Sequence, residues 1–291
     1  MSPRRYHSAY DEETTGRCER ALLTLLGDLG PWRERIYLAG GLAPRYLVGQ
    51  LPEGARPHVG TTDIDLVIGL ALGDETPETY RTLKNNLEKA RFAQEEPSFR
   101  WARDVDGLPV VVEFLCETDE VEPGSIFRPK GESTGSGLGA FNVRGAHLVR
   151  DDFVQRAIEG ERLDGGGRSK VTVRVANVLP YTVLKILAFQ DRHENKDAYD
   201  LVFTLLNHAG GPREAGRAAR SSAVARHPQV DEALALLEER FQDFRQDGPN
   251  AYASFLSAPN DDDERARLRQ EAAATVREFL HGFREEGVET P

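Results

Sequence analysis

The chain has 291 residues, of which 39% are hydrophobic and 29% charged, and its formal net charge is -11. This length allows one large or two ordinary domains, and the longest apolar runs, such as LPVVVEFL and VLKILAF, are too short to span a membrane. The N-terminal residues lack the apolar stretch of a secretory signal, and Cys18 and Cys116 provide neither a disulfide framework nor a metal knuckle. We therefore expect a cytoplasmic protein with no membrane partner.

The negative net charge disfavours a nucleic-acid partner, because phosphate neutralisation requires Lys and Arg. The charge is unevenly distributed, however, since residues 140–228 contain 14 Lys and Arg against 10 Asp and Glu. The hypothesis of a basic surface in this segment is therefore kept.

The first elements are a helix, a strand and a glycine pair. Apolar residues at helical spacing predict a helix over residues 11–29, which ends at Gly30-Pro31. A short strand over residues 36–39 then runs into Gly40-Gly41 and a helix that carries Arg45. Paired glycines let a backbone approach a ligand, and a helix start offers free amides to an anion. Tight packing of the helix on the strand explains the pair equally well.

The stretch RPHVGTTDIDLVIGL, residues 56–70, predicts a short strand entered through a Gly-Thr-Thr turn. Apolar residues alternate with Asp63 and Asp65, so both carboxylates project from one face of the strand. Like charges this close repel each other unless a cation lies between them. Mg²⁺ suits such a pair, because it takes its other ligands from water and phosphate oxygens. The alternative for this motif alone is an edge strand with a solvated acidic face.

A hairpin over residues 99–115 offers a third carboxylate. Two runs of strand-forming residues flank Asp106-Gly107, a dipeptide preferred in tight hairpin turns. In the second strand, Val110, Val112 and Phe114 share one face, so Glu113 lies on the other. If this strand neighbours the acidic strand, Glu113 is a third ligand for the same metal; otherwise it faces outward from a half-exposed strand.

The remaining elements become helical after about Pro180. We predict a polar helix over residues 76–92, capped near Thr76, and a long loop over residues 122–139. Extended segments are predicted over 140–150 and 170–178, and between them a helix over 151–159 and a glycine-rich turn over 165–167. Later helices are predicted over 229–246, 249–257 and 261–286. One arginine group is either an RNA-facing patch or a solvated face and comprises Arg213, Arg217, Arg220 and Arg226.

A second chemical group lies on a predicted helix over residues 179–206. On a continuous helix at about 100° per residue, Lys185, Arg192 and Lys196 fall within about 40° of one another. Such a cationic stripe suits a triphosphate, with Lys185 as a point charge and Arg192 as a planar partner. The alternative is a solvated face held by pairs such as Arg192 with Asp197.

The order and spacing of these motifs resemble the AbiEii/AbiGii-type nucleotidyltransferase toxins, which include the mycobacterial MenT toxins and belong to the polymerase-β-like nucleotidyltransferase superfamily. The resemblance covers about residues 10–207, and family members usually have Ser at the position of Thr61. The matching residues are Gly40-Gly41 with Arg45, the GTTDIDL motif over residues 60–66, and the K-x6-R-x3-KD-x2-DL motif formed by Lys185, Arg192, Lys196, Asp197, Asp200 and Leu201.

The resemblance implies an α+β fold with two domains. A nucleotidyltransferase domain over residues 1–178 would have a mixed β-sheet flanked by helices, and an α-helical domain over residues 179–291 would complete the NTP site.

The resemblance also implies a role for each site residue. Asp63 and Asp65 would hold Mg²⁺ on the NTP phosphates, with Glu113 as a third carboxylate that serves as metal ligand or base. Thr61 and the backbone of Gly60 would contact the triphosphate. The remaining nucleotide-site residues would be Gly40, Gly41, Arg45, Lys185, Arg192, Lys196 and Asp200, the last of which orients the nucleotide or activates the acceptor.

The implied reaction transfers NMP from an NTP to an acceptor hydroxyl with release of pyrophosphate. Relatives modify the 3′ end of tRNA, arrest growth and are neutralised by a separate antitoxin. The implied partners are therefore an NTP, a tRNA and an antitoxin protein. Two alternatives stay open: an enzyme with the same site that modifies a small molecule such as an aminoglycoside, and a catalytically silent module that binds an NTP or an antitoxin.

Overall fold

The computed structural model describes residues 6–68, 77–129, 138–258 and 260–285, with the side chains of residues 77–81 excepted. The chain divides into two compact units. The sheet unit comprises Tyr10–Ala43 and Val59–Ala176, and the helical unit comprises the residues up to Ala9, Pro44–His58 and the residues from Asn177 onward. A mixed sheet in one unit and helices in the other confirm the α+β class.

The sheet unit is organised around β1 (Ile36–Ala39) and β2 (Asp63–Ile68), at the middle of the strand order β3-β4-β5-β2-β1-β9-β8. β2 pairs antiparallel with β1 and parallel with β5 (Leu108–Cys116), and β1 pairs parallel with β9 (Arg168–Ala176). The acidic strand is therefore central, and the alternative of an acidic edge strand is wrong. The other described strands are β3 (Ala93–Gln94), β4 (Arg100–Val105), β6 (Ile126–Phe127), β7 (Ala140–Asn142) and β8 (Phe153–Glu161).

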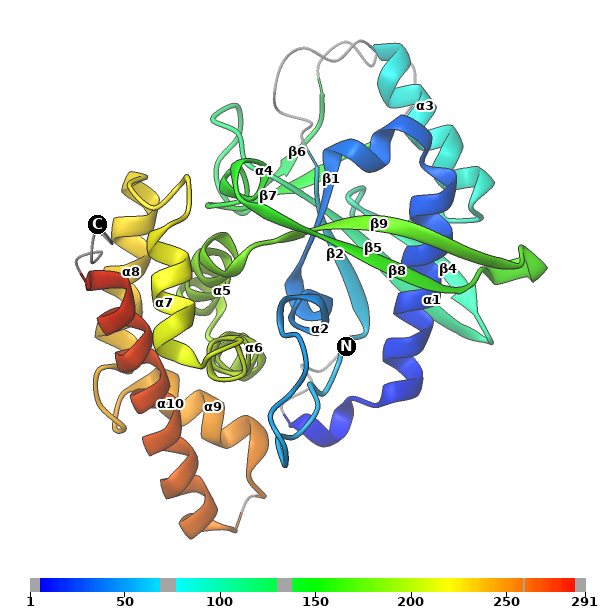
Figure 1. Cartoon of the computed structure of the whole chain (residues 1–291). Helices are drawn as coiled ribbons and strands as arrows, with labels where there is room; N and C mark the ends of the chain where they lie inside the picture. Colours follow the sequence, from blue (N-terminus) through cyan, green and yellow to red (C-terminus); the bar gives the residue numbers. More distant parts are fainter. Residues whose placement is uncertain (1–5, 69–76, 130–137, 259, 286–291) are drawn as a thin grey trace, which may run out of the picture. The chain divides into compact units, whose positions relative to one another are not determined.

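The predicted first helix is confirmed as α1 (Glu12–Asp28), which packs on the sheet against β2, β5, β8 and β9. Figure 1 shows α1 running alongside the sheet. Its start is capped by Asp11, whose Oδ1 accepts the backbone N–H of Thr14 at 2.6 Å. The predicted polar helix is α3 (Pro77–Lys89), which contacts α1; its expected cap, Thr76, lies outside the described residues.

The helical unit is built around α6 (Asn195–Leu206), which contacts α2, α5, α7, α9 and α10. Every residue of α6 from Asp197 to Leu205 is buried, because neighbouring helices cover it on all sides. The predicted C-terminal helices are confirmed as α8, α9 and α10. The bounds are α2 (Pro44–Leu47), α5 (Val178–Arg192), α7 (Pro212–Arg220), α8 (Pro228–Phe241), α9 (Asp247–Leu256) and α10 (Asp262–Arg284).

The helix predicted over residues 151–159 is wrong. Only one helical turn, α4 (Leu148–Asp151), precedes strand β8, which pairs antiparallel with β9 along its whole length. Ile158 and Val171 lie opposite each other in this pairing, and both are buried. The partner strand decides the conformation here, because tertiary context overrides a weak local helix pattern.

The continuous helix predicted over residues 179–206 is also wrong. α5 ends at Arg192, because His193 adopts a left-handed conformation with φ 50°, and α6 starts at Asn195. Lys185 and Arg192 therefore lie on one helix and Lys196 on the next, so they do not form a single stripe.

The turn and loop predictions hold in part. The hairpin at Asp106-Gly107 is confirmed as β4 and β5. The loop predicted over 122–139 contains β6, and its residues 130–137 lie outside the described residues. The segment predicted as extended over 140–150 is a strand only in β7, since α4 begins at Leu148. Of the segment 170–178, residues up to Ala176 belong to β9.

Candidate functional site

The two carboxylates of β2 lie at the centre of the sheet unit. Asp63 and Asp65 are half-buried, whereas Ile64 and Leu66 between and after them are fully buried. The alternation of the strand thus presents both carboxylates on one face, as predicted.

The structure shows why a glycine is needed at position 40, the first of the glycine pair. Ala39 lies opposite Asp65 in the pairing of β1 with β2. Gly40 is the next residue, so its backbone lies close to the Asp65 carboxylate. Gly40 has φ +62°, and a Cβ at this position would overlap Oδ2 of Asp65. A side chain here would displace the carboxylate, so the backbone approach predicted for this glycine is an approach to Asp65. Gly41 is buried in the turn η3 (Gly40–Leu42).

Gly60 and Thr61 form the turn that leads into β2. Gly60 has φ +90°, and a Cβ there would overlap Oγ1 of Thr15 on α1. The backbone N–H of Thr61 donates to Thr15 Oγ1 at 3.1 Å. The hydroxyl of Thr61 donates to Oδ1 of Asp63 at 2.7 Å. Both donors of Thr61 are therefore engaged within the protein, at a residue only 2% exposed.

Glu113 lies beside this pair. β2 and β5 are parallel neighbours with Asp65 opposite Glu113, so the two side chains project from the same face of the sheet. The sequence left open whether these two strands are neighbours, and the pairing shows that they are. The carboxylate of Glu113 forms an ion pair with Arg100 on β4 at 2.5 Å. No group of three or more His, Cys, Asp or Glu among the described residues is arranged to hold a metal ion, so Glu113 as third ligand stays a prediction.

A buried charged cluster lies in the helical unit. Lys185 Nζ donates to Asp197 Oδ1 at 3.1 Å and to Asp200 Oδ2 at 2.7 Å. Arg192 binds Asp197 through two hydrogen bonds of 2.7 and 2.8 Å, and Lys196 lies 2.8 and 3.0 Å from the two oxygens of Asp200. Three cations thus contact two carboxylates. The ion pair expected between Arg192 and Asp197 is present and Arg192 is exposed, but Lys185, Asp197 and Asp200 are buried, so the cluster as a whole is not a solvated face.

The cluster fixes the charge of its members. Burial disfavours ionised Lys185, but the carboxylates of Asp200 and Asp197 outweigh burial and hold its pKa well above the ordinary value. Burial likewise disfavours ionised Asp200, but Lys185, Lys196 and a hydrogen bond from His58 hold its pKa well below the ordinary value. Among the cations, Arg192 is the most exposed: its side chain is 59% exposed, against 8% for Lys185 and 13% for Lys196.

His58 belongs to this cluster and was missed by the sequence analysis. Its Nε2 lies 2.9 Å from Asp200 Oδ1, and its ring stacks on Tyr199 at 5.2 Å and meets the edge of Phe203 at 4.8 Å. Burial lowers the pKa of His58 to about 4, against the opposing effect of Asp200. The ring is therefore neutral at pH 7 and donates its Nε2–H to the carboxylate. No sequence pattern predicts the contact of His58 with Asp200, which lies 142 positions away.

The predicted site residues thus form two groups. Gly40, Gly60, Thr61, Asp63 and Asp65 lie together in the sheet unit, with Glu113 in register beside them. The helical unit contains the charged cluster, and Arg45 lies in its four-residue helix α2.

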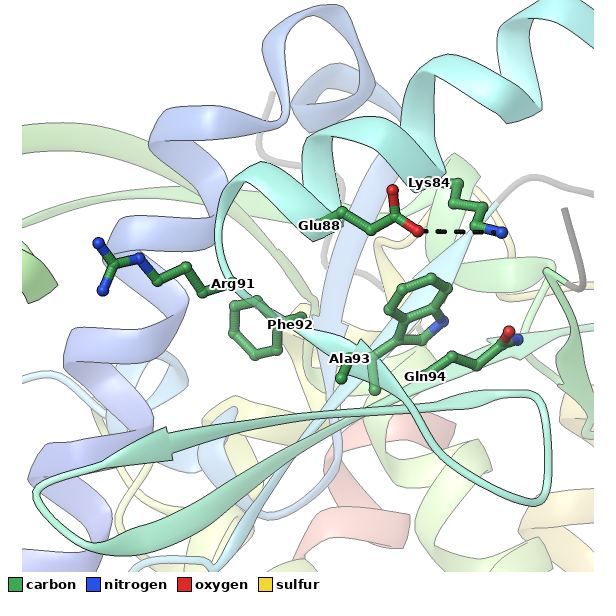
Figure 2. A pocket seen from close by; sticks show the side chains of 7 residues that line it. Lys84, Glu88, Arg91, Phe92, Ala93 and Gln94 are labelled. Atoms are coloured by element: carbon green, nitrogen blue, oxygen red, sulfur yellow. Dashed lines mark ion pairs between the residues drawn. The ribbon is translucent and has the colours of Figure 1, made fainter.

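A cavity elsewhere in the sheet unit contains none of these residues. It has a volume of about 410 Å³, and Figure 2 shows the ion pair of Lys84 with Glu88, 3.9 Å apart, at its wall. The cavity is lined by Lys84, Glu88, Arg91, Phe92, Ala93, Gln94 and Trp101.

Comparison of the chain with family models, with curated proteins and with solved structures found no match. The family resemblance therefore stays a prediction that depends on the motifs quoted above. None of the helices in the described residues has the length and apolarity needed to cross a membrane.

Proposed function

We propose that the chain is a nucleotidyltransferase, with the nucleotidyltransferase fold that its motifs resemble, in which Asp63 and Asp65 hold Mg²⁺ on the phosphates of an NTP. One observation carries this proposal: two half-buried carboxylates share a face of a central strand, and Gly40 leaves Asp65 just enough room. Mg²⁺ is commonly held by one or two carboxylates together with substrate phosphates. The pair therefore suffices without a third protein ligand.

The chemistry assigned to this site is an in-line displacement. Bound Mg²⁺ would neutralise the charge that develops on the phosphates. The oxygen of the acceptor hydroxyl forms a bond to the α-phosphorus, the bond from the α-phosphorus to the bridging oxygen breaks, and pyrophosphate leaves. Glu113 is the carboxylate assigned to take the hydroxyl proton, after release from Arg100. Thr61 holds Asp63 in place through its hydroxyl.

In the charged cluster, we assign phosphate contact to Arg192, because it is the most exposed of the three cations. Lys185 is almost fully buried and keeps Asp197 and Asp200 ionised. Asp200 is a poor proton acceptor at neutral pH, because neighbouring cations hold its pKa well below the ordinary value. Of the two roles expected for Asp200, we therefore propose the orienting one, which this fully buried carboxylate would exert through the cations that it holds in place.

The acceptor proposed from the resemblance is the 3′ end of tRNA, in a toxin that a separate antitoxin neutralises. A cationic small molecule is the second candidate, and one observation favours it. Arg213 and Arg217 of the arginine group both pair with Glu285, at 2.7 Å for Arg217, which reduces the positive charge available to RNA. The net charge of -11 acts in the same direction.

The test is transfer of label from each α-labelled NTP, with Mg²⁺, to total tRNA or to an aminoglycoside. We expect label on an acceptor with the native chain and at least about 100-fold less with Asp65→Asn, because metal stabilisation of phosphate charge is worth several kcal/mol. Asp191→Asn, an exposed aspartate on α5, is the matched control and should transfer normally. Label on tRNA supports the toxin, and label only on the aminoglycoside supports the second candidate. NTP binding without any transfer would overturn the proposal in favour of a silent binding module.

A further inference from the structure

Two side chains of helix α1 contact the backbone of Thr61, one at its N–H and the other at its carbonyl oxygen. Oγ1 of Thr15 accepts the backbone N–H of Thr61 at 3.1 Å, and the thiol of Cys18 lies 3.9 Å from the carbonyl oxygen of Thr61. Thr15 and Cys18 are three residues apart, so they share a face of α1, and both are fully buried. The turn before the acidic strand is therefore fixed by side chains of a helix about 46 residues earlier.

Thr61 transmits this constraint to Asp63. Its hydroxyl donates to Oδ1 of Asp63 at 2.7 Å, so one carboxylate oxygen has a fixed partner and the other has a defined direction. Gly60 makes the contact with Thr15 sterically feasible, because a Cβ there would overlap Thr15 Oγ1.

The hydroxyl of Thr15 has two backbone acceptors within reach. It can donate to the carbonyl oxygen of Asp11 at 3.1 Å, one turn earlier in α1, or to that of Thr61 at 3.4 Å, and either bond leaves a lone pair available to the N–H of Thr61. Asp11 also caps the helix through Thr14, so the first turn of α1 has little freedom to move.

We infer that Thr15 is a positioning residue for the Mg²⁺ site. It acts through Thr61 on Asp63 and touches neither metal nor nucleotide. This inference deepens the proposed function and rests on it.

Two substitutions separate positioning from packing at Thr15. Thr15→Val keeps the shape of the side chain and removes the hydroxyl, whereas Thr15→Ser keeps the hydroxyl and removes a methyl group. Thr24→Val is a matched control, because Thr24 is also buried on α1 and its Oγ1 also accepts a distant backbone N–H, that of Leu163 at 2.9 Å. Thr24 has no bond to the turn of Gly60 and Thr61 among those described.

The measurement is binding of Mn²⁺ to each purified variant by calorimetry, without nucleotide, followed by the Mg²⁺ dependence of transfer. Loss of a group that orients a metal ligand typically weakens metal binding by about 10–100-fold. We therefore expect Thr15→Val to weaken Mn²⁺ binding by at least about 10-fold and to raise the Mg²⁺ concentration for half-maximal transfer by a similar factor. Thr15→Ser and Thr24→Val should remain within about twofold of the native chain.

The inference is overturned if Thr15→Val binds Mn²⁺ as the native chain does, or if Thr24→Val weakens binding equally. It is also overturned if binding by the native chain does not depend on Asp63, as tested with Asp63→Asn. If Thr15→Val fails to fold, Thr61→Val is the substitute, because it removes the hydrogen bond from the Thr61 hydroxyl to Asp63. Native metal affinity in that variant overturns the inference. Mn²⁺ binding that depends on Thr15, in a chain that transfers no label, would sink the proposed reaction but not the positioning role.

Discussion

Each unit of the molecule contains a pair of aspartates close in sequence, and the two pairs differ in their surroundings. Asp63 and Asp65 in the sheet unit are half-buried, and Asp63 accepts a hydrogen bond from a neutral hydroxyl. Asp197 and Asp200 in the helical unit are at most 1% exposed, and both bind cations directly. A buried carboxylate requires such partners, because an isolated charge costs several kcal/mol in the interior.

The difference indicates a division of work. In the helical unit the protein supplies the cations itself, so the carboxylates serve the internal structure and hold Lys185 and Arg192 in place. In the sheet unit both carboxylates are half-buried and so keep exposed surface, which the Mg²⁺ site that we propose would need. Substitutions of Asp197 and Asp200 should therefore change stability, and substitutions of Asp63 and Asp65 should change metal binding and transfer.

The largest expected effect on stability is that of Asp200→Asn. The substitution removes the negative charge and one of the two acceptor oxygens that Lys185, Lys196 and His58 share. Breaking a buried ion pair by removing one partner typically costs about 3–5 kcal/mol, so we expect the free energy of unfolding to fall by that amount in urea titrations. Asp191→Asn, on the exposed part of α5, should change it by less than about 0.5 kcal/mol. Equal stability of the two variants would show that the cluster does not hold the helical unit together.

His58 predicts a smaller, pH-dependent effect. Its pKa is about 4 in the folded chain against an ordinary value of 6.5, chiefly because of burial. The unfolded chain therefore binds more protons between these pH values, so stability is fully present above pH 6.5 and is lost as the pH falls towards 4. A shift of this size corresponds to roughly 3 kcal/mol. The depressed pKa of Asp200 acts at lower pH, below its ordinary value of 3.8.

Urea titrations at several pH values between 4 and 7 test this prediction. His58→Gln keeps a donor near Asp200 but does not titrate, so it should start less stable and show a flatter dependence on pH. His281→Gln, at a side chain 57% exposed, should retain the native dependence. If His58→Gln loses stability over this range as steeply as the native chain, another group is responsible.

The sequence predicts the local elements of the site better than their partners. Alternation of apolar and acidic residues predicts β2 and the shared face of Asp63 and Asp65, because a strand has a period of two residues. The Asp106-Gly107 turn predicts the β4–β5 hairpin. That β5 pairs with β2, and so brings Glu113 beside Asp65, depends on sheet order, which no local pattern determines.

The errors have a common physical cause. His193 ends α5 without a glycine or proline signal, so the angular argument for a cationic stripe used a helix that does not continue. The charges meet because α5 packs on α6, and His58 joins them from a distant segment through its own contacts with Asp200, Tyr199 and Phe203 of α6. Thr15 is similar: it is one of several threonines on α1, and only the fold shows that it binds Thr61.

The smallest expected effect concerns the space beside Asp65. Gly40→Ala introduces a Cβ that would overlap Oδ2 of Asp65, at a backbone φ of +62°. Gly54→Ala is a matched control, because Gly54 has φ +79° but no atom near the added Cβ. Both substitutions should lower the free energy of unfolding by about 1–2 kcal/mol, because alanine is strained in a left-handed conformation. Only Gly40→Ala moves the carboxylate, so it alone should lower transfer, by about 10–100-fold, as displaced metal ligands typically do.

Comparison of transfer rates and unfolding free energies for these two variants separates strain from displacement. Equal loss of stability with loss of transfer only in Gly40→Ala would tie activity to the position of Asp65. If both variants transfer label at the native rate, the close approach of Gly40 serves packing of β1 on β2, and the argument that this glycine keeps room for a metal-binding carboxylate fails. Gly54 lies in the helical unit, so its variant reports only the strain of the backbone. Any further loss of transfer in Gly40→Ala therefore reports a change in the sheet unit.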